Sequence, residues 1–274
     1  MTGRLVVCPT PIGNLEDVTL RVLAALREAD VVACEDTRRT RILLDRYGVS
    51  AQLVPYHEHN ERARAGELVS RMRGGSVVAL VSDAGMPLVS DPGYVLVRAC
   101  VAAGLPVEVL PGPSAAITAL VASGLPASEW RFHGFLPRKK GELERVLSSS
   151  EGTLVAFESP RRVPATLALL ASLSPDRAVA VCRELTKAHE EVVRGSAASL
   201  ASRYEGAPPR GEVVLVVGPS SERAPGGSSA EPPGLDALRG LVEAGAKPRK
   251  AAAIVAELTG GRANELYRAL TAGK

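Results

Sequence analysis

Seven short runs of apolar, mostly β-branched residues recur along the chain and alternate with longer amphipathic stretches. The runs cover residues 5–8, 31–34, 77–81, 107–110, 154–157, 179–182 and 213–217. Buried strands that alternate with helices are typical of a mostly parallel sheet covered by helices. With 274 residues, 46% of them hydrophobic, the chain is long enough for one large or two ordinary domains of this α/β class.

Turn-rich segments divide the chain further. The stretch "SGLPASEW", residues 123–130, separates an N-terminal α/β domain (1–122) from a smaller C-terminal α/β domain (123–218). Residues 219–233 are rich in Ser, Pro and Gly, which predicts a flexible linker. Two or three short helices follow in a basic helical extension (234–274). A helix-turn-helix-like unit and a solvated helical hairpin remain alternatives for this extension.

Positive charge is concentrated in the extension, which contains seven Lys or Arg and four acidic residues. Its net charge of +3 equals the net charge of the whole chain. Such a concentration favours contact with nucleic acid, although the small net charge alone does not. No apolar run reaches the roughly 20 residues that span a bilayer, and the first residues lack signal-peptide features, so we expect no membrane contact and a cytoplasmic location. The four cysteines are far apart and are expected to pack in the core.

Several common catalytic and binding motifs are absent from the sequence. There is no G-x-G-x-x-G after the first strand, no G-x-x-x-x-G-K-[ST] and no G-x-S-x-G. His57 and His59 form only an H-x-H pair with no third ligand nearby, so we expect no metal site. A dinucleotide fingerprint, a P-loop and a nucleophile elbow are therefore disfavoured.

Five loops at the predicted carboxyl ends of strands carry unusual residues. Ligands of open α/β sheets bind at these ends, where glycines allow close backbone approach and helix N-termini can hold an anion. Asp83 follows its strand by two positions and can accept hydrogen bonds from ribose hydroxyls or face a cation. Asp91 we interpret as a helix cap, with Ser159 in the same role farther on. The loops are "PTPIGN" (9–14), "SDAGMPLVSDPG" (82–93), "PGPSAA" (111–116), "ESPRR" (158–162) and "RELTKAHEE" (183–191).

In this order, and together with "FHGFLPRK", the loops closely resemble the bacterial small-subunit ribosomal RNA (cytidine) 2'-O-methyltransferases of the tetrapyrrole methylase superfamily. The resemblance covers residues 4–218, and an ordered series of motifs is far more specific than any one of them. It implies two α/β domains, usually in a homodimer, with S-adenosylmethionine bound in the cleft between them. The implied substrate is a cytidine ribose of 16S rRNA in the small ribosomal subunit.

The resemblance also implies which residues contact the cofactor: Pro11, Asp83, Ala84, Gly85, Pro87, Leu88, Ser114, Ala115 and Phe157. The sequence departs from the usual family pattern at three positions. Met86 replaces a common Thr, Arg161 a common His and His189 a common aromatic residue. Since Met86 lies in the cofactor loop, a side-chain hydroxyl there is not essential for binding.

A ribose 2'-hydroxyl must lose its proton as the methyl group arrives, so a base or an electrostatic helper is sought. Glu184 and Lys187 are the first candidates, with Arg183 as a phosphate or hydroxyl contact and Glu158 next in line. A surface salt bridge between Glu184 and Lys187 explains that pair equally well. Two other functions also stay open, methylation of a precorrin-like tetrapyrrole and non-catalytic binding of S-adenosylmethionine.

Overall fold

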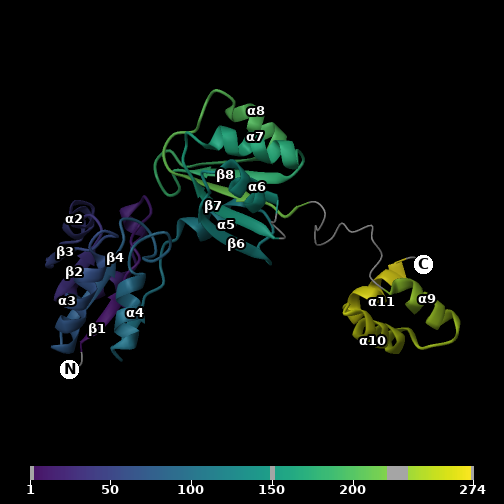
Figure 1. Ribbon diagram of the computed structural model, residues 1–274, viewed down its shortest axis with the longest axis horizontal. Helices are drawn as coiled ribbons and strands as arrows, with labels where there is room; N and C mark the ends of the chain where they lie inside the picture. The colour runs from purple at the N-terminus through teal and green to yellow at the C-terminus, as the bar shows by residue number, and fades with distance from the viewer. Residues whose placement is uncertain (1–2, 149–151, 221–233, 273–274) are drawn as a thin grey trace. The chain divides into compact units, whose positions relative to one another are not determined.

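Two five-stranded sheets, each covered by helices, make up most of the molecule in the computed structural model (Figure 1). The structure describes residues 3–148, 152–220 and 234–272. The chain divides into two compact units, Met1–Ser220 and Ser221–Lys274, and both sheets belong to the first. The predicted α/β class with a helical C-terminal extension is thereby confirmed.

The first sheet is entirely parallel. Its strands, in spatial order, are β3 (Leu53–Pro55), β2 (Val31–Cys34), β4 (Val77–Val81), β1 (Arg4–Val7) and β5 (Val107–Val109). Successive side chains point to opposite faces, so Val7 packs in one core and Val6 in the other. One face is covered by α1 (Leu20–Glu28) and α2 (Thr37–Arg46), and the other by α3 (Glu61–Arg73) and α4 (Tyr94–Ala102). A 3₁₀ turn, η1 (Leu15–Asp17), precedes α1.

The second sheet is mixed, so the prediction of a mostly parallel sheet is wrong for this half. Among neighbouring strands only the β6–β7 pair is parallel, while β10 is antiparallel to both of its neighbours and β9 is antiparallel to β8. Residues 184–190 join β8 to β9, and this link is too short for the crossover that a parallel pair needs. The order is β6 (Trp130–Phe135), β7 (Thr153–Glu158), β10 (Val213–Val217), β8 (Ala178–Arg183) and β9 (Glu191–Ser196).

Four helices cover the second sheet. One face carries α6 (Lys140–Ser148), α7 (Val163–Leu173) and α8 (Ala197–Tyr204), and the other carries α5 (Ala115–Ser123). Although α5 follows β5 of the first sheet, its buried Ala116, Ala119 and Leu120 pack on the second. The boundary after residue 122 stays a prediction, and α5 joins the two halves. All four cysteines are buried in these cores, as expected.

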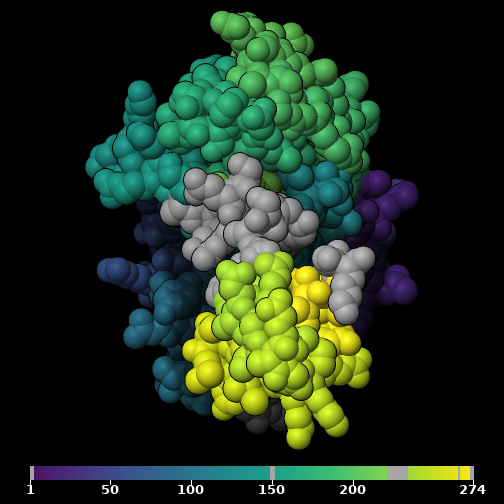
Figure 2. Space-filling view, turned by 90° about the vertical axis from the view of Figure 1, so that its right-hand side faces the viewer, coloured from purple at the N-terminus to yellow at the C-terminus, as the bar shows by residue number. Residues whose placement is uncertain are grey.

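The described part of the C-terminal unit, residues 234–272, consists of three helices, α9 (Leu235–Glu243), α10 (Pro248–Thr259) and α11 (Ala263–Ala272). They enclose a core of their own that includes Leu238, Val255 and Leu266. Figure 2 shows their side chains, yellow-green to yellow, packed without a hollow on the visible face. The alternative of a solvated hairpin is therefore wrong, because a third helix closes the core. Most of the predicted linker, residues 221–233, lies outside the described residues.

None of the helices in the described ranges combines the length and the apolar character that a membrane crossing requires.

Candidate functional site

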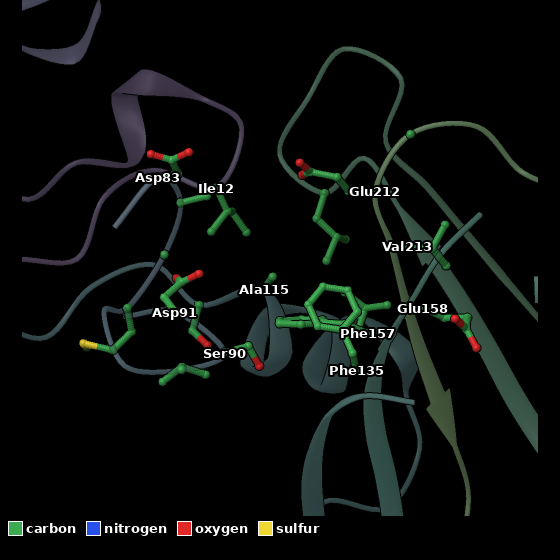
Figure 3. Close-up of a pocket in the computed structure, with 18 of the residues that line it drawn as sticks. Ile12, Asp83, Ser90, Asp91, Ala115, Phe135, Phe157, Glu158, Glu212 and Val213 are labelled. Atoms are coloured by element: carbon green, nitrogen blue, oxygen red, sulfur yellow. The ribbon is translucent and has the colours of Figure 1, made fainter. Parts of the chain in front are cut away.

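A cavity of about 450 Å³ opens where loops of the first sheet meet α5 and the second sheet (Figure 3). Its volume is within the usual range of ligand pockets, roughly 300–1,000 Å³. The first sheet contributes residues that follow the carboxyl ends of β1, β2 and β4. Residues 157–160 and 211–214 come from the second sheet and its loops. The predicted strand-end loops thus converge on one site.

The loop after β4 is held rigidly against the loop after β1. Thr10 and Gly85 exchange backbone hydrogen bonds at 2.9 Å, and the Thr10 hydroxyl donates to the Ser82 carbonyl at 3.0 Å. Gly85 has a φ of +79°, which suits glycine. Leu88 and Ser90 also have positive φ values, 73° and 67°, and such strain in non-glycine residues persists where the surrounding structure over-determines it. This loop therefore forms a pre-shaped wall of the cavity.

Three carboxylates, Glu35, Asp83 and Asp91, line this wall. Burial, and then the charge of Glu35, raises the pKa of Asp91 to about 6, although a hydrogen bond with Ser82 opposes the shift. Burial and the charge of Asp83 raise the pKa of Glu35. Both shifts show that negative charge is crowded here, which suits a cationic ligand group.

Asp83 is the best anchored of the three carboxylates. The backbone N–H of Asp36 donates to Asp83 Oδ1 at 3.0 Å, and an Arg39 guanidinium nitrogen lies 3.5 Å from Oδ2. Asp83 therefore has a local role that the sequence did not reveal, because it ties the β2–α2 junction to the loop after β4. Its side chain is 21% exposed, so a ligand can still reach it.

The interpretation of Asp91 as a helix cap is wrong. Helix α4 begins at Tyr94 after Gly93, without a side-chain cap, and Asp91 lines the cavity instead. Gly93 has a φ of +138°, and a Cβ there would lie 2.7 Å from Leu88 Cδ1, so this tight turn separates Asp91 from the helix. The cap assigned to Ser159 is also wrong. A turn from Ser159 to Arg162 precedes α7, which begins at Val163.

The opposite wall is aromatic and apolar. The Phe135 and Phe157 rings meet edge to face with centroids 5.4 Å apart, and Phe135 remains 66% exposed. Among the described residues, the side chain of Ser114 does not cap α5, so the first N–H groups of that helix can meet another acceptor. The cavity thus combines acidic, aromatic and backbone-donor surfaces (Figure 3).

Six of the nine cofactor residues implied by the resemblance line this cavity: Asp83, Ala84, Gly85, Ser114, Ala115 and Phe157. Pro11, Pro87 and Leu88 do not; Leu88 packs against the core of the first sheet. Sequence reasoning missed other lining residues. Glu35 directly follows β2, so the rule that ligands bind at the carboxyl ends of strands could have identified it. Phe135, in contrast, lies on a strand that was not predicted. The missed residues include Ile12, Glu35, Ser90, Asp91, Phe135 and Glu212.

Among the catalytic candidates, only Glu158 borders the cavity, and its carboxylate points away from it (Figure 3). That carboxylate is buried and accepts hydrogen bonds from the Ser159 N–H at 2.7 Å and the Thr166 hydroxyl at 2.8 Å. An Arg162 guanidinium nitrogen lies 3.4 Å away. These contacts hold the "ESPRR" turn in place.

Glu184 and Lys187 form a salt bridge beside the cavity. Glu184 Oε1 accepts from Lys187 Nζ and from the Glu212 N–H, both at 2.9 Å, and Lys187 also bonds to Glu212 Oε2 at 2.9 Å. The Glu212 N–H and then Lys187 lower the pKa of Glu184. Burial opposes the charge of Lys187, but its two carboxylate partners outweigh burial and raise its pKa. Both groups are thus charged at neutral pH.

Arg183, the remaining candidate, donates from Nε to Glu191 Oε2 at 2.7 Å.

No group of three or more His, Cys, Asp or Glu suited to a metal ion occurs in the described parts of the chain.

The family described as Tetrapyrrole (Corrin/Porphyrin) Methylases matches residues 4–201. The chain belongs to the tetrapyrrole methylase family. A relative named "Ribosomal RNA small subunit methyltransferase I", from Mesorhizobium japonicum, is 47% identical over 271 residues, which cover 97% of this chain and 90% of the relative. A relative of the same name from Thermotoga maritima is 44% identical over 217 residues, 78% of this chain and 98% of its own length.

Solved structures of tetrapyrrole methylases have the same fold. A uroporphyrin-III-C-methyltransferase from Thermus thermophilus matches with a TM-score of 0.55 and 25% identity, over 80% of this chain and 94% of its own. Diphthine synthase matches with a TM-score of 0.59 at 16% identity, over 79% and 90% of the two chains, and shows the fold alone. Members of this fold therefore carry names that refer to very different substrates.

Proposed function

We propose that this chain transfers the methyl group of S-adenosylmethionine to the 2'-hydroxyl of a cytidine in 16S ribosomal RNA of the small ribosomal subunit. One observation carries the proposal, the 47% identity, over 97% of the chain, to a protein named as a small-subunit ribosomal RNA methyltransferase. The solved uroporphyrin methyltransferase is more distant, at 25% identity. The nucleotide and the atom follow from the resemblance of the loop motifs. We further propose that the protein acts as a homodimer in the cytoplasm.

The residues of the cavity fit S-adenosylmethionine. The acidic wall of Glu35, Asp83 and Asp91 complements its sulfonium and ammonium charges. The free N–H groups at the start of α5 suit its carboxylate, and Phe135 and Phe157 offer faces to its adenine. When bound, the cofactor supplies an electrophilic methyl group.

The residues of the chain would act mainly by positioning the ribose. Lys187 is an ammonium at neutral pH and cannot accept a proton, and the Glu158 carboxylate is held away from the cavity. We therefore give Glu184 and Lys187 a positioning role, in which they fix Glu212 and the loop before β10 at the cavity rim. Holding the 2'-hydroxyl in line with the methyl group is worth several kcal/mol in comparable reactions, up to about 7–11.

The test is incubation of the purified protein with methyl-labelled S-adenosylmethionine and either assembled small ribosomal subunits or a precorrin. We expect label in the rRNA, recovered as 2'-O-methylcytidine after nuclease digestion. Label in the tetrapyrrole instead would establish the alternative reaction. Cofactor binding without transfer to either substrate would point to a non-catalytic protein.

A further inference from the structure

A second depression adjoins the cofactor cavity. It is an open groove of about 870 Å³, lined by residues 159–161 and 207–211, and we refer to it as the basic groove. Ser159, Pro160 and Gly211 line both the groove and the cavity, so the two share a rim. A polymer that lies in the groove therefore passes the mouth of the cavity.

The groove carries two exposed guanidinium groups, those of Arg161 and Arg210, and no acidic residue lines it. Among the described residues, neither arginine has a carboxylate partner, whereas the neighbouring Arg162 and Arg183 are paired with Glu158 and Glu191. Two unpaired cations in one concave surface create a local positive potential.

The backbone of the groove is pre-organised. Three of its lining residues are prolines, Pro160, Pro208 and Pro209, and each fixes its own φ. Arg161 follows Pro160 directly, and Arg210 follows Pro209. Both guanidinium groups therefore belong to conformationally restricted backbone segments, so less conformational entropy of the protein is lost when a ligand binds.

The charges of the groove and of the cavity are opposite. Glu35, Asp83 and Asp91 make the far wall of the cavity acidic, while the groove on the near rim is basic. A polyanion is repelled by the first and attracted by the second, so its phosphates would stay in the groove while a ribose enters the cavity mouth.

We propose that the basic groove binds the phosphate backbone of the RNA strand next to the target nucleotide, through Arg161 and Arg210. This inference rests on the proposed function. Guanidinium groups bind phosphate oxygens in a bidentate manner and keep their charge at every physiological pH.

The test uses the full chain, assembled small subunits and the variants Arg161→Ala, Arg210→Ala and the double variant. We expect each single change to raise KM for the subunit about tenfold, the effect of losing one charge-assisted hydrogen bond, and to leave kcat and the affinity for S-adenosylmethionine unchanged. The slope of log kcat/KM against log salt should become shallower by about 0.7 per arginine removed from a single-strand contact. Arg161→Lys should restore part of the loss, because it keeps the charge without the planar fork.

Arg73→Ala is the matched control. Arg73 is exposed in the last turn of α3, before the amino end of β4 and so at the opposite edge of the first sheet. The Arg73→Ala variant removes the same charge as each groove variant and should change neither KM nor the salt slope.

If KM and the salt slope are unchanged in the double variant while rRNA is still methylated, the groove does not bind the RNA backbone. The proposed function is unaffected by that result. Failure of the unmodified protein to methylate rRNA would instead remove the proposed function. If the arginine variants lose activity only toward a carboxylated tetrapyrrole, the groove binds that molecule and the RNA assignment is wrong.

Discussion

Replacement of Asp91 by Asn is expected to stabilise the cofactor-free protein and to weaken its binding of S-adenosylmethionine. Burial and the charge of Glu35 raise the pKa of Asp91 to about 6, so the native state holds the ionised carboxylate at a cost at neutral pH. Asn has the same shape and keeps an oxygen that can accept a hydrogen bond from Ser82. It removes the charge that a cationic ligand would use.

The expected gain in the free energy of unfolding follows from the shift in the pKa of Asp91 from its ordinary value of 3.8 to about 6. Each pKa unit corresponds to about 1.36 kcal/mol, which gives at most about 3 kcal/mol at pH 7.5 and, because the side chain is partly exposed, about 1–2 kcal/mol after screening. At about 2–4 °C per kcal/mol for a unit of this size, Tm should rise by roughly 2–8 °C.

The sign of the pH dependence is set by the raised pKa. The folded state binds the Asp91 proton more tightly than the unfolded state, so this contribution to stability is fully present below pH 3.8 and is lost as the pH rises through about 6. The advantage of the variant should therefore be largest at pH 7.5 and vanish near pH 4.

Thermal unfolding without cofactor at pH 4.5, 6 and 7.5, with calorimetric titration of S-adenosylmethionine, measures both effects. Asp36→Asn is the control of opposite sign. The side chain and the backbone N–H of Arg38 lower the pKa of Asp36 to about 2. Asn can still cap α2 but loses the charge that pairs with Arg38, so its introduction should lower Tm at pH 7.5. The argument is refuted if Asp91→Asn does not raise Tm at pH 7.5, or if it raises Tm equally at all three pH values.

Three further outcomes are expected. Asp83→Ala should weaken cofactor binding in calorimetry and, since Asp83 accepts the Asp36 N–H, lower stability by about 1 kcal/mol; an unchanged dissociation constant would remove Asp83 from the site. Glu184→Ala and Lys187→Ala should lower turnover on ribosomal substrate more than cofactor affinity, and wild-type rates in both would exclude their positioning role. A chain ending at Ser220 should stay folded and bind cofactor, because the C-terminal unit has a core of its own, but bind rRNA less tightly with a shallower salt slope; an insoluble product would contradict this.

Six of the seven strands that the sequence predicted are well buried, while the seventh, β5, lies at a sheet edge and is mostly exposed. The three that it missed, β3, β6 and β9, all lie at sheet edges. Edge strands are covered less completely, and the "WRFHGF" of β6 alternates exposed and half-buried residues instead of forming an apolar run. The direction of β10 was also hidden, because its five buried valine and leucine residues would read the same in a parallel or an antiparallel strand.

For the site, the rule that ligands bind at the carboxyl ends of strands predicted loops that do converge on one cavity, but not the roles of the residues within them. Asp91 stands before "PG" and a helix, a pattern that fits a cap, and only the φ of +138° at Gly93 shows that the chain turns before the helix begins. The contacts of Thr166 with Glu158 and of Glu212 with Glu184 are equally invisible in the sequence, because they form only through tertiary packing, whereas the Glu184–Lys187 salt bridge was foreseen as an alternative.

The cavity and the groove separate two chemical tasks within one fold. The acidic wall consists of residues after β2 and β4 of the first sheet, whereas residues 159–161 and 207–211 belong to loops of the second. Under the two proposals, a change of substrate requires altered charge and shape only in the second set, while the surface for the methyl donor is kept. We therefore expect substrate preference to follow the groove, where two arginines each follow a proline, and cofactor affinity to follow the acidic wall.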